Sequence, residues 1–176
     1  MKRVIRILPL VMLIALVWPA ALRATERELN SSQVQNRLAT FELKAGQANR
    51  MAHELESLTR SEVSWESHAH YLNSLRHSVN EMGRLLLQLE TAKPAASDLQ
   101  AQTIEHARPH LEEFAARLEG AITSLNSDHR IISHMDYRDG LRQIASNANL
   151  LSQKVDALLD YHQASQRLGE LEVVIN

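Results

Sequence analysis

Apolar residues recur along four stretches of the chain at alternating steps of three and four, which is the spacing of one face of an α-helix. The longest run keeps this spacing without a break at Trp65, His68, Leu72, Leu75, Val79, Met82, Leu86 and Leu89. Beyond residue 30, prolines occur only at positions 94 and 109, so few residues interrupt long helices. The pattern predicts helices over about 31–58, 64–91, 97–125 and 133–170.

The other three apolar stripes have the same period, so each predicted helix has one face that must be covered. These stripes consist of Val34, Leu38, Phe41, Ala45, Ala48, Ala52 and Leu55; of Ile104, Ala107, Leu111, Phe114, Leu118, Ala121 and Leu125; and of Tyr137, Leu141, Ile144, Ala148, Leu151, Val155, Leu158 and His162. Short connections between long helices favour antiparallel neighbours. We therefore predict an all-α fold, an antiparallel up-down-up-down four-helix bundle over residues 25–170, followed by a frayed tail at 171–176.

Two features of the third helix can be predicted from single residues. Ser97 and Gln100 have the spacing of a capping box and mark the start of the helix. Pro109 lies inside the helix at an outward position, where it removes one backbone hydrogen bond and clashes with the carbonyl of Glu105. We expect a kink or a brief break at 105–108.

The first 24 residues have the order of a secretory signal peptide. Three basic residues fall within the first six positions, an uncharged apolar stretch covers 7–18, and Pro19 precedes a small residue, Ala24, at the expected cleavage site. The alternative is an uncleaved membrane anchor, but a span needs about 20 apolar residues and the stretch 7–22 is shorter. We expect cleavage after residue 24, a periplasmic or secreted protein, and no membrane span in the mature chain.

The mature chain is acidic and contains no cysteine. Cleavage removes four of the 19 basic residues and none of the 21 acidic residues, which leaves 15 against 21 and a formal net charge of −6. A negative domain offers no electrostatic footprint to nucleic acid or anionic lipid, so we expect no nucleic-acid partner. The lack of cysteine excludes disulfides, thiolate metal sites and covalent c-type haem attachment.

Nine histidines are the chemically most distinctive part of the composition. His106 and His110 lie four residues apart on one predicted helix, which is the spacing with which two imidazoles chelate one metal ion. Glu105, Glu112 and Glu113 are near enough in sequence to act as further ligands. The simpler interpretation is a pair of histidines on a solvated helix face.

A second group of histidines is predicted at one end of the bundle. In an antiparallel bundle the end of the first helix brings His53 toward His68, and the last connection brings His129 and His134 to the same end. Four such histidines would bind a transition metal or respond to pH. The simpler interpretation of His68 is a core histidine whose polar atoms are paired. His162, at the opposite end, is explained by helix-terminal electrostatics.

The sequence argues against several catalytic and cofactor classes. No histidine follows a glutamate by three residues, so the Glu-x-x-His pairs of di-metal bundles are missing. Non-covalent haem would need a second axial ligand level with His162, and the start of the first helix offers none. A glycine-flanked serine elbow and a phosphate-binding glycine loop are also missing. We expect no enzymatic activity and no cofactor.

Leu85 and Leu87 widen the apolar face of the second helix beyond its seam. Such residues fit either the flank of the core or a surface for a protein partner or a second copy of the chain. Heptad seams are satisfied equally by neighbours within one chain and by neighbours from another, so the pattern leaves a homo-oligomer open.

Parts of the chain resemble a group of uncharacterised exported bacterial helical proteins. The resemblance is carried by residues 64–69 (SWESHA), 72–73 (LN), 79–83 (VNEMG), 121–122 (AI), 125–126 (LN) and Tyr137. It implies a helical bundle and assigns no role to any residue.

The sequence thus predicts an exported, non-enzymatic helical bundle that acts as a structural, interaction or stress-associated binding module in the cell envelope. The alternative is a histidine-rich metal-binding or pH-responsive periplasmic bundle, with His68 and His53 or His106 and His110 as the working groups. Acid conditions are relevant to this alternative, because nine imidazoles that titrate near pH ~6.5 would reverse a net charge of −6.

Overall fold

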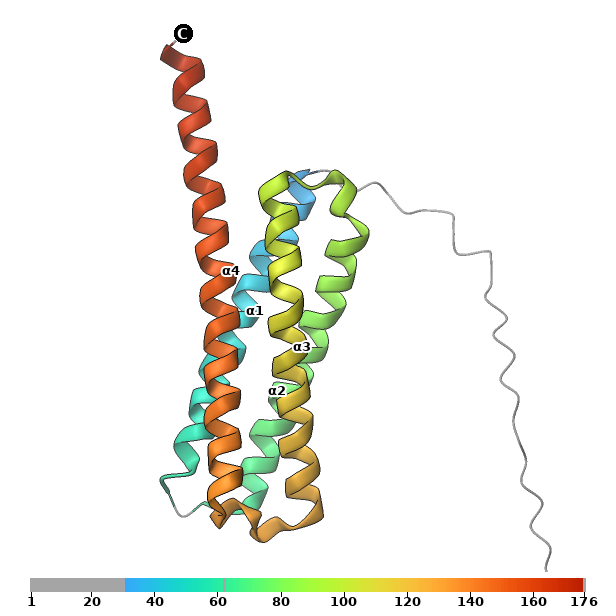
Figure 1. The fold of residues 1–176 in the computed structure, drawn as a ribbon, viewed down its shortest axis with the longest axis vertical. Coiled ribbons are helices and arrows are strands. Elements are labelled where there is room, and N and C mark those ends of the chain that lie inside the picture. Colours follow the sequence, from blue (N-terminus) through green and yellow to red (C-terminus); the bar gives the residue numbers. More distant parts are fainter. Residues whose placement is uncertain (1–30, 62, 176) are drawn as a thin grey trace, which may run out of the picture.

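The structure is a computed structural model that describes residues 31–61 and 63–175, the side chains of 169, 170 and 172–175 excepted (Figure 1). Four long helices account for most of these residues: α1 (Ser31–Leu58), α2 (Trp65–Thr91), α3 (Asp98–Ser127) and α4 (Met135–Ile175). Two short 3₁₀ helices, η2 (Lys93–Ala95) and η3 (His129–Ser133), lie in the last two connections. The described residues contain no β-strand, which confirms the predicted all-α fold with four helices. The predicted signal peptide at 1–24 lies outside them.

The four helices pack side by side around one core. Each helix contacts its neighbours in the sequence, and α1 also contacts α4, which closes the bundle (Figure 1). The contacts between α1 and α2 define their relative direction. Arg37 contacts Gln88 near the start of α1, and Lys44 forms an ion pair with Glu81 further along it. Residue numbers therefore fall along α2 as they rise along α1.

The predicted apolar stripes form this core. Every predicted position of the first and third stripes is buried, and Phe41 and Phe114 are the largest of these side chains. Burying an apolar side chain of this size contributes about 1.5–3 kcal/mol to folding. The chain has no cysteine, so no disulfide supplements this term. Apolar packing between helices is therefore the main source of stability.

Two seam positions differ from the prediction. Trp65 is half-buried, and the buried part of its stripe begins at His68. On α4 the buried residue is Leu159, while Leu158 is half-buried, so the predicted position is wrong by one residue. An α-helix drifts by about 20° per seven residues from a strict heptad. Three heptads separate Leu158 from Tyr137, and the accumulated drift turns the next residue toward the core.

The start of α3 confirms one of the two predictions for that helix. The Ser97 hydroxyl accepts a hydrogen bond from the Gln100 backbone N–H, and the Gln100 side chain accepts one from the Ser97 N–H, which completes the capping box. Of the kink or brief break predicted at 105–108, the break is wrong, because α3 continues through Pro109 without interruption, and the kink stays a prediction. Pro109 is exposed, so water can solvate the carbonyl that loses its donor.

The last helix is longer than expected. α4 continues to Ile175, so the tail predicted to be frayed at 171–176 is helical up to that residue. Figure 1 shows the final turns of α4, drawn in red, extending past the end of the bundle at which α1 begins. None of the described helices combines the length and the apolar character needed to cross a membrane.

Candidate functional site

The most buried histidine joins α2 to α4. His68 lies in the seam of α2 with 2% of its surface exposed, and its Nδ1 atom is 3.3 Å from the hydroxyl oxygen of Tyr137 on α4. The hydrogen bond satisfies both polar groups, as expected for a core histidine. Burial lowers the pKa of the His68 imidazole below its ordinary value of 6.5, and the positive charge of Arg138 lowers this pKa further. Burial also raises the pKa of the Tyr137 hydroxyl. The pair is therefore neutral near neutral pH.

A second aromatic contact lies one turn earlier on α2. The rings of Trp65 and His129 are stacked, with 3.7 Å between their centroids and 11° between their planes. His129 belongs to η3, so the stack attaches the last connection to the start of α2. This contact explains why Trp65 is half-buried at the end of the bundle, since its ring covers η3 as well as the core.

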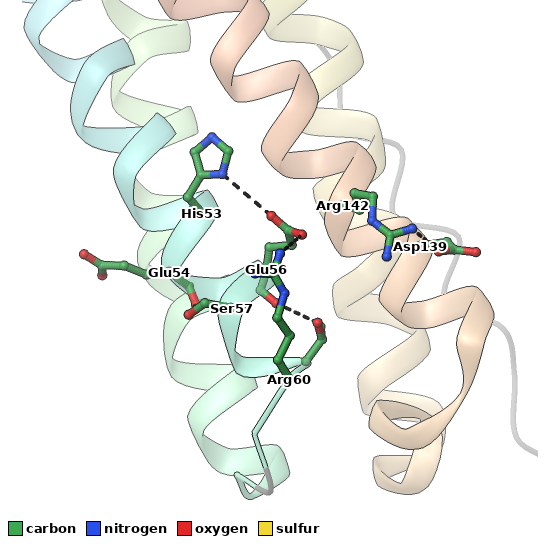
Figure 2. A network of polar contacts seen from close by, with 8 residues as sticks. His53, Glu54, Glu56, Ser57, Arg60, Asp139 and Arg142 are labelled. Atoms are coloured by element: carbon green, nitrogen blue, oxygen red, sulfur yellow. Dashed lines mark hydrogen bonds and ion pairs between the residues drawn. The ribbon is translucent and has the colours of Figure 1, made fainter.

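The remaining histidines predicted at this end have other surroundings. Figure 2 shows His53 directed toward Glu56 on the same helix, with 3.7 Å between the His53 Nδ1 and the Glu56 Oε2 atoms. Glu56 also forms an ion pair with Arg60 at 2.9 Å. His134 is exposed beside η3. Among the described residues, no three histidine, aspartate or glutamate side chains are arranged to hold a metal ion.

The second predicted histidine pair lies on the surface of α3. His106 is exposed and His110 is half-buried. The three glutamates considered as further ligands each pair with a basic residue: Glu105 with Lys93, Glu112 with Arg108, and Glu113 with Arg117. These ion pairs fit the interpretation of a solvated helix face, because the carboxylates already have partners of opposite charge.

His162 lies near the opposite end of α4. Its side chain is buried, and its Nε2 atom is 3.0 Å from the amide nitrogen of Gln166 one turn later. Its Nδ1 atom is buried and has no hydrogen-bond partner among the described residues. This contact links His162, the last buried residue of α4, to a residue in the part of the helix that continues beyond the bundle.

The structure reveals one surface that the sequence analysis did not identify. A second apolar stripe follows the outer face of α4, and we call Ala157, Tyr161, Ala164, Leu168 and Leu171 the α4 outer stripe. All five are exposed, and the exposed fractions of Tyr161, Leu168 and Leu171 are 60%, 64% and 58%. Their spacing is visible in the sequence. The α4 outer stripe lies outside the core stripe predicted for α4, and only the structure shows that its residues are left uncovered.

Comparisons of the chain with protein-family models, with curated proteins and with solved structures find no match. Two features of the described residues bear on function. One is the buried pair of His68 and Tyr137, and the other is the α4 outer stripe.

Proposed function

We propose that the chain is an exported, non-enzymatic helical bundle that acts as a structural or interaction module in the cell envelope, either periplasmic or secreted. Residues 1–24 support export by the order of their basic, apolar and small residues. The opposite residue order of the contacts between α1 and α2 supports an up-down-up-down antiparallel bundle over residues 25–170. A bundle of this kind presents helix faces, which are suitable for binding other proteins.

The α4 outer stripe is the observation that carries the interaction role. Large apolar side chains scattered singly on a surface are normal, but a contiguous apolar patch marks a binding site. Tyr161, Leu168 and Leu171 fall on one helix face and are more than half exposed. Leu87, by contrast, is exposed on α2, while Leu85 packs against the core, so the widened face of α2 is mainly a core flank.

Export can be tested by determining the N-terminus of the protein recovered from a bacterial host. We expect cleavage after Ala24 and recovery in the periplasmic fraction or the medium. A chain that keeps residues 1–24 and stays in the membrane fraction would contradict export as a soluble domain.

The interaction role can be tested by site-specific photo-crosslinking in intact cells. A crosslinking residue at position 168 is compared with one at position 87, because Leu168 and Leu87 are similarly exposed, at 64% and 66%. We expect a protein adduct from position 168 and little from position 87. Equal adducts from both positions, or none from position 168, would contradict the proposal.

A pH-responsive bundle is the second candidate, and the burial of His68 favours it. The groups that face this imidazole are the Tyr137 hydroxyl and the positive charge of Arg138, both from α4. Protonation would place a second positive charge beside Arg138 and leave the His68 Nδ1 atom able only to donate to the Tyr137 hydroxyl oxygen. Acid should therefore loosen the contact between α2 and α4. Intrinsic tryptophan fluorescence should report this, since Trp65 lies one turn away, and an unchanged spectrum from neutral to mildly acidic pH would contradict it.

Metal binding by the histidines remains part of this second candidate and has its own test. Thermal unfolding is measured with and without zinc, copper or nickel, because an ion that binds only the folded state raises the melting temperature. Metal content of the untagged protein is measured in parallel. No bound metal and no shift would remove His106, His110, His68 and His53 as ligands.

A further inference from the structure

The apolar face of α4 changes direction where the helix leaves the bundle. Up to His162, the buried residues of α4 point toward α1 and α3, with Val155 and Leu159 as the last apolar members. Beyond His162 the large described apolar residues are Leu168 and Leu171, and both are exposed. The final turns therefore keep an apolar face that no part of the described bundle covers.

This face has the period of a coiled-coil seam. Successive members of the α4 outer stripe are separated by four, three, four and three residues, so Tyr161 and Leu168 occupy a positions and Ala157, Ala164 and Leu171 occupy d positions. The stripe rises about 21 Å along the helix at 1.5 Å per residue. The a position before Ala157 is Lys154, which ends the apolar run in that direction.

We propose that the α4 outer stripe binds a second copy of this chain, through parallel pairing of the two α4 helices. The contact is a short two-stranded coiled coil in which each stripe faces its own copy. The proposal rests on the interaction role proposed above and names one partner for it. A two-fold axis parallel to α4 generates the pair, and such isologous dimers are the commonest assemblies.

The charges that flank the stripe favour parallel pairing. Arg167 lies at a g position, and the sequence has a glutamate five residues later, at the e position 172. A parallel coiled coil brings each g position next to the e position five residues later in the other helix, so opposite charges meet on both sides of the seam. In an antiparallel pair the g positions of both helices meet, so one register would bring Arg167 against its own copy and the other would bring it against the exposed Asp160.

The shape of the molecule also admits this pairing. The stripe lies on the side of α4 opposite Val155 and Leu159, so the two bundles would stand on opposite sides of the paired helices. Ala157 and Ala164 alternate with larger side chains along the seam, which lets the helices approach closely at two levels. Two heptads bury little area, so we expect a dimer that forms and dissociates with protein concentration.

Sedimentation equilibrium of the chain from residue 25 tests the proposal over a dilution series. The stripe variant carries Leu168→Glu and Leu171→Glu, and the matched control carries Leu43→Glu and Leu87→Glu, two exposed leucines outside the stripe. We expect wild type and control to dimerise alike, and the stripe variant to associate about tenfold or more weakly. Circular dichroism checks that both variants stay folded. A wild type that is monomeric throughout, or a stripe variant that dimerises like the control, would overturn the inference.

A charge exchange tests the parallel direction separately. Arg167→Glu should weaken the dimer, because it places two acidic residues on each side of the seam. Adding Glu172→Arg in the same chain should restore association, since the opposite charges meet again with their positions exchanged. Failure of the double variant to recover would overturn parallel pairing.

Self-association and the proposed interaction role can fail independently, and the two failures give different results. A monomer in solution whose position 168 crosslinks to a different protein in cells would overturn self-association and leave the interaction role supported. A dimer in solution with no crosslink in cells would support self-association and contradict the role in the envelope.

Discussion

At the scale of single residues, the buried imidazole of His68 is the side chain whose chemistry depends most on the fold. It is enclosed between α2 and α4 and shares a hydrogen bond with Tyr137. An isolated buried polar group costs about 1–3 kcal/mol, so the hydrogen bond is what makes a histidine tolerable at a seam position. The neutral imidazole is the form that the fold selects, because burial and the charge of Arg138 both lower its pKa.

The sign of the pH dependence follows from this lowered pKa. In the unfolded chain the imidazole takes up a proton near its ordinary value of 6.5, while in the folded chain it resists protonation until a lower pH. The stability contributed by neutral His68 is therefore fully present above pH 6.5 and falls as the pH decreases toward the lowered folded pKa.

We predict that His68→Leu reduces the loss of stability on acidification. Urea unfolding between about pH 7 and pH 5 measures this, because the leucine has no proton to bind in that range. His77→Leu is the control, since the side chain of His77 is 76% exposed, and it should keep the slope of the wild type. If His68→Leu and the wild type lose stability equally over this range, the buried histidine is not the source of the dependence.

At the scale of elements, the sequence predicts the stripes well and the contacts between segments poorly. Helical periodicity is a local property, so the stripes of α1 and α3 follow directly from spacing. The prediction named Leu158 where Leu159 is the buried residue, because a strict seven-residue repeat drifts away from the true helical period over several turns. The stack of Trp65 on His129 joins segments far apart in sequence, and no local pattern encodes it. The outward direction of the α4 outer stripe likewise depends on how α4 packs against α1 and α3.

The start of α3 gives a prediction about capping. Ser97→Ala removes the hydroxyl that accepts the Gln100 N–H bond, and we expect a loss of about 1 kcal/mol in the free energy of unfolding. Ser64→Ala is the matched control, because Ser64 precedes α2 without a side-chain cap bond. Chemical denaturation of both variants measures the difference. An equal or larger loss for Ser64→Ala would contradict the assignment of the capping box.

The proline within α3 gives a second prediction at this scale. Pro109→Ala restores a backbone donor in an exposed helix interior, and alanine is the residue that a helix accommodates best. We expect a gain of about 1–2 kcal/mol in stability, because some of the intrinsic difference of about 3 kcal/mol is offset by the stiffer unfolded chain of the proline form. Gly120→Ala on the same helix is the comparison, with an expected gain of about 0.5–1 kcal/mol. A loss of stability in Pro109→Ala would show that the proline fits the helix at no cost.

At the scale of the whole molecule, a bundle closed by its own core carries one helix that continues beyond it. Figure 1 shows the final turns of α4 continuing past the bundle. The bundle buries its apolar stripes internally, whereas Leu168 and Leu171 on α4 are exposed. A helical segment of this length is marginal in water without packing, since most helical stability in proteins comes from a covered apolar face. The proposed dimer supplies a second molecule that covers this face of α4.

Amide hydrogen exchange of the chain from residue 25, measured at low and at high protein concentration, tests this pairing most directly. We predict that peptides from residues 163–175, beyond the last buried residue of α4, exchange rapidly in dilute solution and become protected when the protein is concentrated, while peptides from the core of α1 and α3 are protected at both concentrations. Equal exchange of residues 163–175 at the two concentrations would contradict self-association, because a second copy would then have no effect on the end of α4.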